Sequence, residues 1–146
     1  MTVQVLYKNN AKSANTGVIT LFTEEKFQIK NKATFLSKNA VSYVEKILKT
    51  KKDNKEKIIS FNISEKTTVI VIAVKKDLNG HGIENLGASF FNFVKKNSFK
   101  EISIISDSLN SKAGEDFMGS FIHGLKLKSY EFNIYKSKKT ENKLLI

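Results

Sequence analysis

The chain has 146 residues, of which 40% are hydrophobic, with no Cys and a formal net charge of +11 at pH 7. This length suits one domain with a single core, and the lack of Cys excludes disulfides and thiolate metal sites. The opening residues show no signal-peptide pattern, and no apolar run approaches the roughly 18 residues of a membrane span. We therefore expect one cytoplasmic domain without a membrane segment.

The positive charge comes from Lys alone, because all 25 basic residues are Lys and none is Arg. Without the planar guanidinium fork, bidentate recognition of bases or phosphates is excluded, and only contacts of single ammonium groups with phosphates remain. The lysines are spread along the chain, which favours a general surface composition over a dedicated nucleic-acid interface. The possible phosphate contacts lie in the last quarter of the chain, at Lys126, Lys128, Lys136, Lys138 and Lys139.

The chain begins with a pattern typical of β-structure. Val3, Val5 and Tyr7 alternate with polar residues, and Gly17 opens the apolar run that ends at Phe22. This pattern predicts two strands joined by a polar loop.

An amphipathic helix is expected next. Thr34 is placed to cap its start, and the Lys-rich segment 49–57 closes it. One face of this helix would hold the apolar residues Leu36, Ala40, Tyr43, Val44, Ile47 and Leu48.

The central part of the chain predicts two strands on either side of a turn at residues 65–67. Ile58, Ile59, Phe61 and Ile63 form the first strand, and the run TVIVIAV at residues 68–74 forms the second. A continuous β-branched run without polar alternation indicates a strand that is covered on both faces. This strand is therefore expected in the middle of the sheet.

The remaining elements are predicted as a helix, a strand and a long helix. Helical spacing of apolar residues runs from Ile83 to Val94, a short apolar run covers 102–105, and helical spacing resumes from Phe117 to Leu125. The repeated order of strand, helix and strand implies right-handed crossovers. We expect an α/β fold in which helices sandwich a mainly parallel mixed sheet, as a three-layer α/β/α domain.

The loop at residues 79–82 follows the central strand and precedes a helix, where backbone amides often bind phosphate. Its sequence, however, lacks the GxGxxG spacing, and Asp77 just before it would repel an anion. A plain strand-to-helix turn needs the same Gly80 and Gly82. We favour the plain turn.

The sequence contains no arrangement of residues that predicts catalysis. Its two histidines, His81 and His123, have no HExxH or paired-His spacing around them. The serines at 103, 106, 108 and 111 lie at a strand end without a nucleophile elbow. In the last helix, Gly114, Gly119, Ser120 and Gly124 instead indicate a close approach to a neighbouring element, because Gly costs roughly 1 kcal/mol in a helix interior.

The stretch FMGSFIHGLKLKSYEFNIYKSKK, residues 117–139, resembles the end of the amino-terminal domain of the leucyl aminopeptidase (cytosol aminopeptidase) family. There a helix rich in small residues runs into a Tyr-x-Phe-(Asp/Asn)-x-Tyr-Lys-(Ser/Thr)-Lys-Lys signature. The matching residues here are Tyr130, Phe132, Asn133, Tyr135, Lys136, Ser137, Lys138 and Lys139. Earlier parts of the chain agree with the family in order, beginning with an opening β-hairpin that contains Gly17.

The resemblance implies that residues 1–135 are a macro-domain-like amino-terminal domain, and that residues 136–146 begin a linker to an absent carboxy-terminal catalytic domain. The abrupt apolar end at Leu144–Ile146 is interpreted as an exposed strand start cut from a longer chain. In the family, two divalent metals, Mn or Zn, activate water in that catalytic domain to remove amino-terminal residues from peptides, and six subunits assemble. This fragment is expected to hold no catalytic residue, cofactor or metal, and to act in oligomer contacts and active-site access.

Two alternatives remain open. One is a free-standing macro-type module that binds ADP-ribose or another nucleotide near Gly80 and Gly82. The other is non-specific nucleic-acid binding through lysines, which would be insensitive to sequence and steeply weakened by salt.

Overall fold

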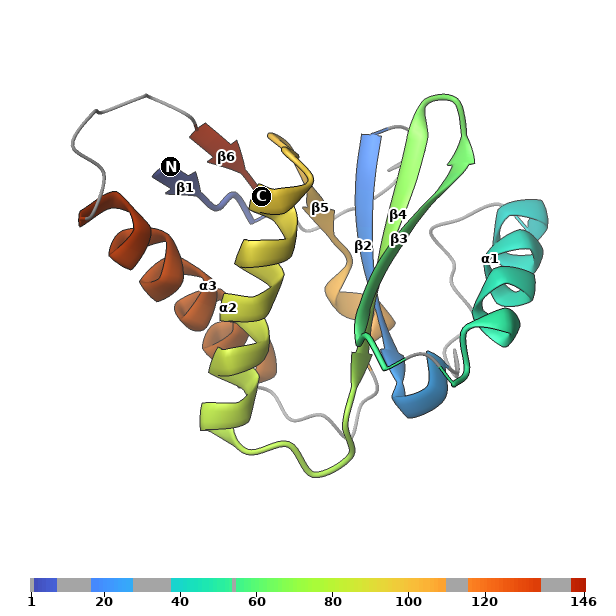
Figure 1. The fold of residues 1–146 in the computed structure, drawn as a ribbon, viewed down its shortest axis with the longest axis horizontal. Coiled ribbons are helices and arrows are strands. Elements are labelled where there is room, and N and C mark those ends of the chain that lie inside the picture. Colours follow the sequence, from blue (N-terminus) through green and yellow to red (C-terminus); the bar gives the residue numbers. More distant parts are fainter. Residues whose placement is uncertain (1, 8–16, 28–37, 54, 110–115, 135–142) are drawn as a thin grey trace. The chain divides into compact units, whose positions relative to one another are not determined.

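The computed structural model describes residues 2–7, 17–27, 38–53, 55–109, 116–134 and 143–146 (Figure 1). They belong to two compact units built from interleaved segments of the chain. The sheet unit comprises residues 8–76 and 103–113, and the helical unit comprises residues 1–7, 77–102 and 114–146.

The sheet unit contains a four-stranded sheet with the strand order β3-β4-β2-β5. Strand β2 lies parallel to both β4 and β5, whereas β3 and β4 form an antiparallel hairpin. Its elements in chain order are β2 (Gly17–Glu24), the 3-10 turn η1 (Glu25–Phe27), α1 (Lys38–Thr50), β3 (Ile58–Ser64), β4 (Thr67–Val74), β5 (Ser103–Ile104) and the 3-10 turn η2 (Ser106–Ser108).

Helix α1 packs its apolar face onto this sheet. Val44 and Leu48, one helical turn apart, are buried in one cluster with Ile19, Leu21 and Val71 of the two central strands. The predicted amphipathic helix is therefore confirmed, although its predicted cap Thr34 lies outside the described residues.

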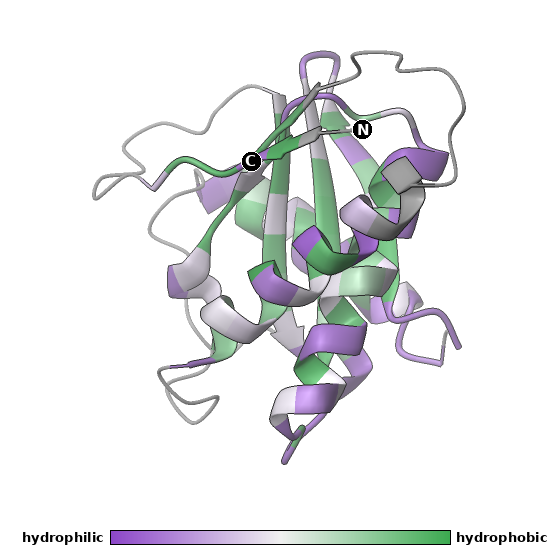
Figure 2. Cartoon of the chain, turned by 90° about the vertical axis from the view of Figure 1, so that its left-hand side faces the viewer, coloured by the Kyte–Doolittle hydropathy of each residue, from purple (hydrophilic) through white to green (hydrophobic). Residues whose placement is uncertain are grey.

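Strand β4 is buried along both of its faces. Val69 and Val71 belong to the cluster beside α1, and the alternate residues Ile70 and Ile72 are also fully buried. Figure 2 shows the hydrophobic colour along the strands of this sheet. The prediction of a central strand from its continuous β-branched run is confirmed by its place between β3 and β2.

The helical unit is built around two long helices, α2 (Gly80–Lys96) and α3 (Phe117–Ile134). The ring of Phe121 lies 5.5 Å from that of Phe90 and 6.1 Å from that of Phe117, measured between centroids. Phe90 and Phe121 are fully buried. These aromatic contacts form the core of the helix pair.

Two short parallel strands, β1 (Thr2–Gln4) and β6 (Lys143–Leu145), complete the helical unit. The pairing continues past β1, because the Leu6 amide donates to the carbonyl of Ile146 at 2.9 Å. On its other side, β6 pairs with the backbone around Glu101.

The expected opening hairpin is wrong. Strand β1 pairs with β6, whereas β2 pairs with β4 and β5, so the first two strands of the chain are not partners. Alternation of apolar and polar residues predicts a strand but carries no information about which strand lies beside it.

The apolar end of the chain is not exposed as we expected, because Leu144 is completely buried within β6. The predicted boundary between residues 135 and 136 lies outside the described residues and stays a prediction. Among the helices of the described chain, none combines the length and apolar character that crossing a membrane requires. The chain is thus a mixed α/β protein, as the sequence predicts, and three of the four strand pairings among its described residues are parallel.

Candidate functional site

The carboxy-terminal half of α3 holds the two predicted phosphate contacts that the structure describes. Lys126 is exposed and Lys128 is half-buried. Two positions along an α-helix differ by about 200° in direction, so these side chains project from different sides of α3. The other predicted contacts, Lys136, Lys138 and Lys139, lie outside the described residues, and the five-lysine patch stays a prediction.

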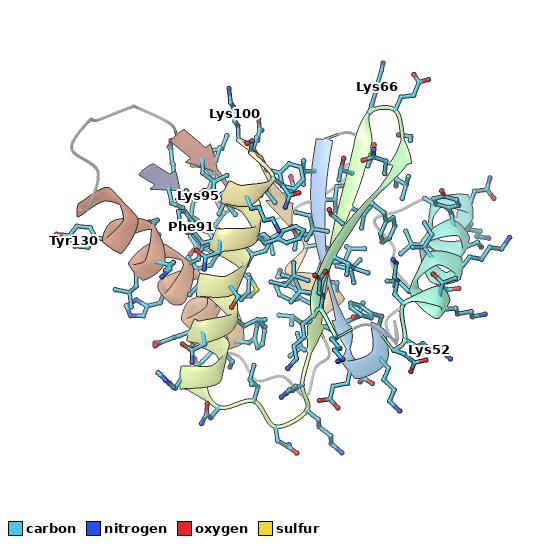
Figure 3. The ribbon with its side chains drawn as sticks, in the orientation of Figure 1. Lys52, Lys66, Phe91, Lys95, Lys100 and Tyr130 are labelled. Carbon is cyan, nitrogen blue, oxygen red and sulfur yellow. The ribbon has the colours of Figure 1, made fainter. Side chains whose placement is uncertain are left out.

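Two large apolar side chains are exposed on the same part of α3. Leu127 is 49% exposed and Tyr130 is 64% exposed. They are three positions apart, so they lie on the same side of the helix. In Figure 3 the ring of Tyr130 points away from α3. Tyr130 is part of the family signature identified in the sequence, whereas Leu127 is not singled out there. The sequence indicates Leu127 only as an apolar residue that interrupts the polar side of the helix.

Helices α2 and α3 approach until their backbones touch. A Cβ atom at Gly124 would lie 2.0 Å from the carbonyl oxygen of Glu84, and a Cβ atom at Gly87 would lie 2.0 Å from that of Phe121. Only Gly fits at either place, because real Cβ atoms do not come so close to backbone atoms. The prediction of a close approach at Gly124 is confirmed, and its partner is α2.

The same crossing explains the environment of His123. Its Nε2 lies 3.9 Å from Oε1 of Glu84, and both side chains are more than a third exposed. An exposed pair at this distance contributes little to stability. The pair forms part of the helix surface.

The loop before α2 is organised by its own cap. Oδ1 of Asn79 accepts a hydrogen bond from the Gly82 amide at 2.7 Å, and the Asn79 carbonyl accepts from the Ile83 amide at 2.9 Å. An Asn side chain in this position satisfies an amide that a bound phosphate would otherwise need. The geometry is that of a capped helix start, which agrees with the plain-turn interpretation.

A pair of lysines lies at the open end of the β3–β4 hairpin in the sheet unit. The hydrogen bond from the Lys75 side chain lowers the pKa of Lys57, and slight burial and the Lys75 charge lower it further, while the Glu25 charge opposes the shift. The backbone brings the two lysines together, because the Ala73 amide donates to the Lys57 carbonyl at 2.8 Å. Nothing in this pair indicates a reaction.

One of the serines near the end of β5, Ser108, has a structural role. Strand β5 is only two residues long, and the Ile105 amide still donates to Thr20 of β2. Two residues beyond Thr20 in β2, the Phe22 amide donates instead to Oγ of Ser108 at 2.9 Å. The Ser108 hydroxyl in turn donates to the Ile105 carbonyl. Ser108 thus replaces a strand residue where β5 ends.

A metal site is not offered by the described part of the chain. Within it, no three side chains of His, Cys, Asp or Glu gather into a group that would hold a metal ion. The two divalent metals that the resemblance implies stay a prediction for a catalytic portion beyond this domain.

The fold is that of a macrodomain-like α/β domain. The macrodomain of Thermus aquaticus DarG superposes with a TM-score of 0.64 and 7% identity over 99% of this chain and 96% of its own. A mutant of tomato leucine aminopeptidase superposes with a TM-score of 0.58 and 12% identity, covering 100% of this chain and 32% of its own. At these identities the similarity concerns the fold alone.

The sequence then defines the family. The profile described as the amino-terminal domain of the cytosol aminopeptidase family matches residues 18–139. The chain belongs to this family, and the resemblance inferred from residues 117–139 is confirmed. The chain spans about a third of the length of the tomato enzyme. No curated protein matches it.

Proposed function

We propose that this chain is the non-catalytic amino-terminal domain of a metal-dependent leucyl aminopeptidase, acting in oligomer assembly and in access to the active sites. Family membership over residues 18–139 is the observation that carries the proposal. The parent enzyme would remove amino-terminal residues from peptides in the cytoplasm, with two Mn or Zn ions in its catalytic portion. Its partners would be that portion and the sister subunits of a homohexamer.

The structure supports a structural rather than a chemical role for the domain. Two polar side chains, Asn79 at a helix start and Ser108 at a strand end, are used in hydrogen bonds within the domain. The tomato enzyme that shares the fold extends well beyond the region aligned with this chain. A structural domain preceding a larger catalytic portion accounts for both observations.

The test compares three proteins from one gene: the full reading frame, residues 1–146 alone, and the frame without residues 1–146. With Mn²⁺ or Zn²⁺ present, we expect the full protein to hydrolyse leucine anilides and to lose this activity when the metal is chelated. Residues 1–146 should show no hydrolysis. Removal of residues 1–146 should change the molar mass of the assembly measured by light scattering. A reading frame without a metal-binding carboxylate cluster after the domain contradicts the proposal.

The second candidate is a free-standing macro-type module that binds ADP-ribose or another nucleotide. The observation in its favour is the macrodomain fold, which extends over 99% of the chain. Against it, the Asn79 side chain already occupies the Gly82 amide in the loop where the nucleotide was expected. Calorimetric titration with ADP-ribose separates the two candidates, because the first expects no heat of binding at millimolar ligand.

A further inference from the structure

Helix α3 carries apolar residues on more sides than its described neighbours cover. Phe117, Phe121 and Leu125 are buried, whereas Leu127 and Tyr130 remain about half exposed or more. An amphipathic surface helix would place polar residues at these two positions, as it does at the exposed His123 and Lys126. One side of α3 therefore lacks a covering partner among the described residues.

The exposed residues form a continuous surface, which we call the α3 outer face and define by His123, Lys126, Leu127 and Tyr130. Their spacing of three and four positions places them on one side of the helix. Tyr side chains are enriched at protein contact surfaces, in which apolar groups form the centre and polar or charged groups lie at the rim.

A second copy of this chain is a poor occupant for the α3 outer face. In a two-fold dimer the same patch lies opposite itself, so the Lys126 ammonium groups of both copies would be brought together. The chain also carries a formal charge of +11, which opposes self-association. The charge instead fits a partner surface with acidic groups at its rim.

The position of the face along the chain indicates which partner this is. The family match ends at residue 139, five residues beyond Ile134, the last residue of α3. In the tomato enzyme, the region aligned with this chain is 32% of the protein, so a much larger portion is available to cover the domain. Leu127 and Tyr130 lie in the last two turns of α3, close in sequence to the end of the match.

We propose that the α3 outer face is the docking surface for the catalytic portion of the aminopeptidase, which contacts Leu127 and Tyr130 with apolar groups and Lys126 with an acidic group. This inference rests on the proposed function, since it requires a catalytic portion in the same protein. It adds the surface and the chemistry of the contact.

The absence of Cys from the chain permits a direct test. Leu127→Cys and Tyr43→Cys form a matched pair, because Leu127 on α3 is 49% exposed and Tyr43 on α1 is 48% exposed. Each variant is made in residues 1–146 and in the full-length protein, and maleimide labelling at that position is followed by peptide mass spectrometry. In residues 1–146 both thiols should react at similar rates. In the full-length protein, we expect the Leu127→Cys thiol to react at least about tenfold more slowly than in residues 1–146, because the centre of an interface excludes solvent. The Tyr43→Cys thiol should stay as reactive as before.

The outcomes distinguish the two proposals. Equal labelling of both positions in a full-length protein that retains peptidase activity overturns the docking surface and leaves the proposed function standing. A full-length protein without peptidase activity overturns the proposed function. If the Leu127→Cys thiol is already protected in the isolated residues 1–146, and this protection increases with protein concentration, a second copy of the domain covers it. This result also overturns the proposal that the catalytic portion docks on the α3 outer face. A Leu127→Asp variant gives a second readout, since loss of docking should separate the unfolding transitions of the two portions in calorimetry.

Discussion

Ser108 shows how one hydroxyl group maintains a sheet where its edge strand ends. Strand β5 stops after Ile104, and the Phe22 amide of β2 donates to the Ser108 hydroxyl. We expect Ser108→Ala to lower the free energy of unfolding by about 1–3 kcal/mol, since it removes two hydrogen bonds, one from the Phe22 amide and one to the Ile105 carbonyl. Chemical denaturation measures the change. Ser106→Ala, at an exposed position in the same turn, should stay within about 0.5 kcal/mol of the natural protein; equal effects of both changes would contradict this role.

Lys57 and Lys75 give a prediction about pH at the same scale. The pKa of Lys57 lies below its ordinary value of 10.5 in the folded protein, chiefly because of the hydrogen bond from Lys75. Between the lowered pKa and 10.5 the unfolded chain binds more protons, so stability increases as the pH rises through this window. Below this window, where Lys57 is protonated, the neighbouring Lys75 charge destabilises the folded protein slightly.

Lys75→Gln should therefore raise the melting temperature slightly at pH 7. The gain should diminish as the pH rises and disappear above the ordinary pKa of a lysine, because Lys57 is then neutral in both states. Lys66→Gln, at an exposed position in the turn of the same hairpin, is the control and should show no such pH dependence. A gain that persists unchanged at high pH would show that the charge pair is not its cause.

The crossing of α2 and α3 yields the sharpest prediction for an element. Gly124→Ala would place a methyl group against the Glu84 carbonyl, so the helices must separate. We expect a loss of about 3 kcal/mol or more in the free energy of unfolding, at the upper end for overpacking. The matched control is Gly119→Ala in the same helix, where a Cβ atom meets nothing within 4 Å. This change should stabilise the protein by about 0.5–1 kcal/mol, because Ala is the better helix former.

The contrast between these two glycines also shows what the sequence does and does not predict. Both belong to the predicted last helix and look equivalent in the sequence, yet of the two only Gly124 is held against another backbone. Elements with strong local patterns, such as the β-branched run of β4 and the apolar spacing of α2, are predicted at nearly their observed positions. Partners are not predicted, because β1 and β6 meet from opposite ends of the chain and no local pattern links them.

The same difference between local patterns and tertiary contacts applies to the candidate sites. The sequence identifies Lys126 and Lys128 as neighbours, but the helix directs them to different sides. It also shows Ser108 as one serine among several, and only the early end of β5 gives this residue its role. The α3 outer face depends on which sides of the helix the fold covers, and that is a property of tertiary packing.

At the scale of the whole molecule, the charge of +11 predicts weak attraction to any polyanion. Without Arg, this attraction should be insensitive to sequence and should fall steeply with salt, because each neutralised phosphate releases counterion. Changing Lys126 and Lys128 together to Gln should reduce the salt slope by at most about two, since each lysine neutralises at most one phosphate. Gel-shift measurements at several salt concentrations determine the slope.

A control double change, Lys52→Gln with Lys66→Gln, removes the same charge from exposed positions of the sheet unit (Figure 3). If both double variants reduce the slope equally, the phosphate-binding lysines are spread over the surface and α3 has no special part in the binding. Sequence-selective binding that persists at physiological salt would contradict the interpretation of the lysines as a general surface composition.

The pairing of β1 with β6 has a consequence for how the protein is made. A ribosome makes residues 2–4 before residues 143–145, so β1 emerges long before its partner strand exists. Until residues 143–145 are made, β1 therefore lacks the strand that it pairs with in the folded domain, and it is available to proteases and to the strands of other chains. The two-stranded sheet of the helical unit can form only after residues 143–145 have been translated, so the rate of translation sets the earliest time at which this unit is complete.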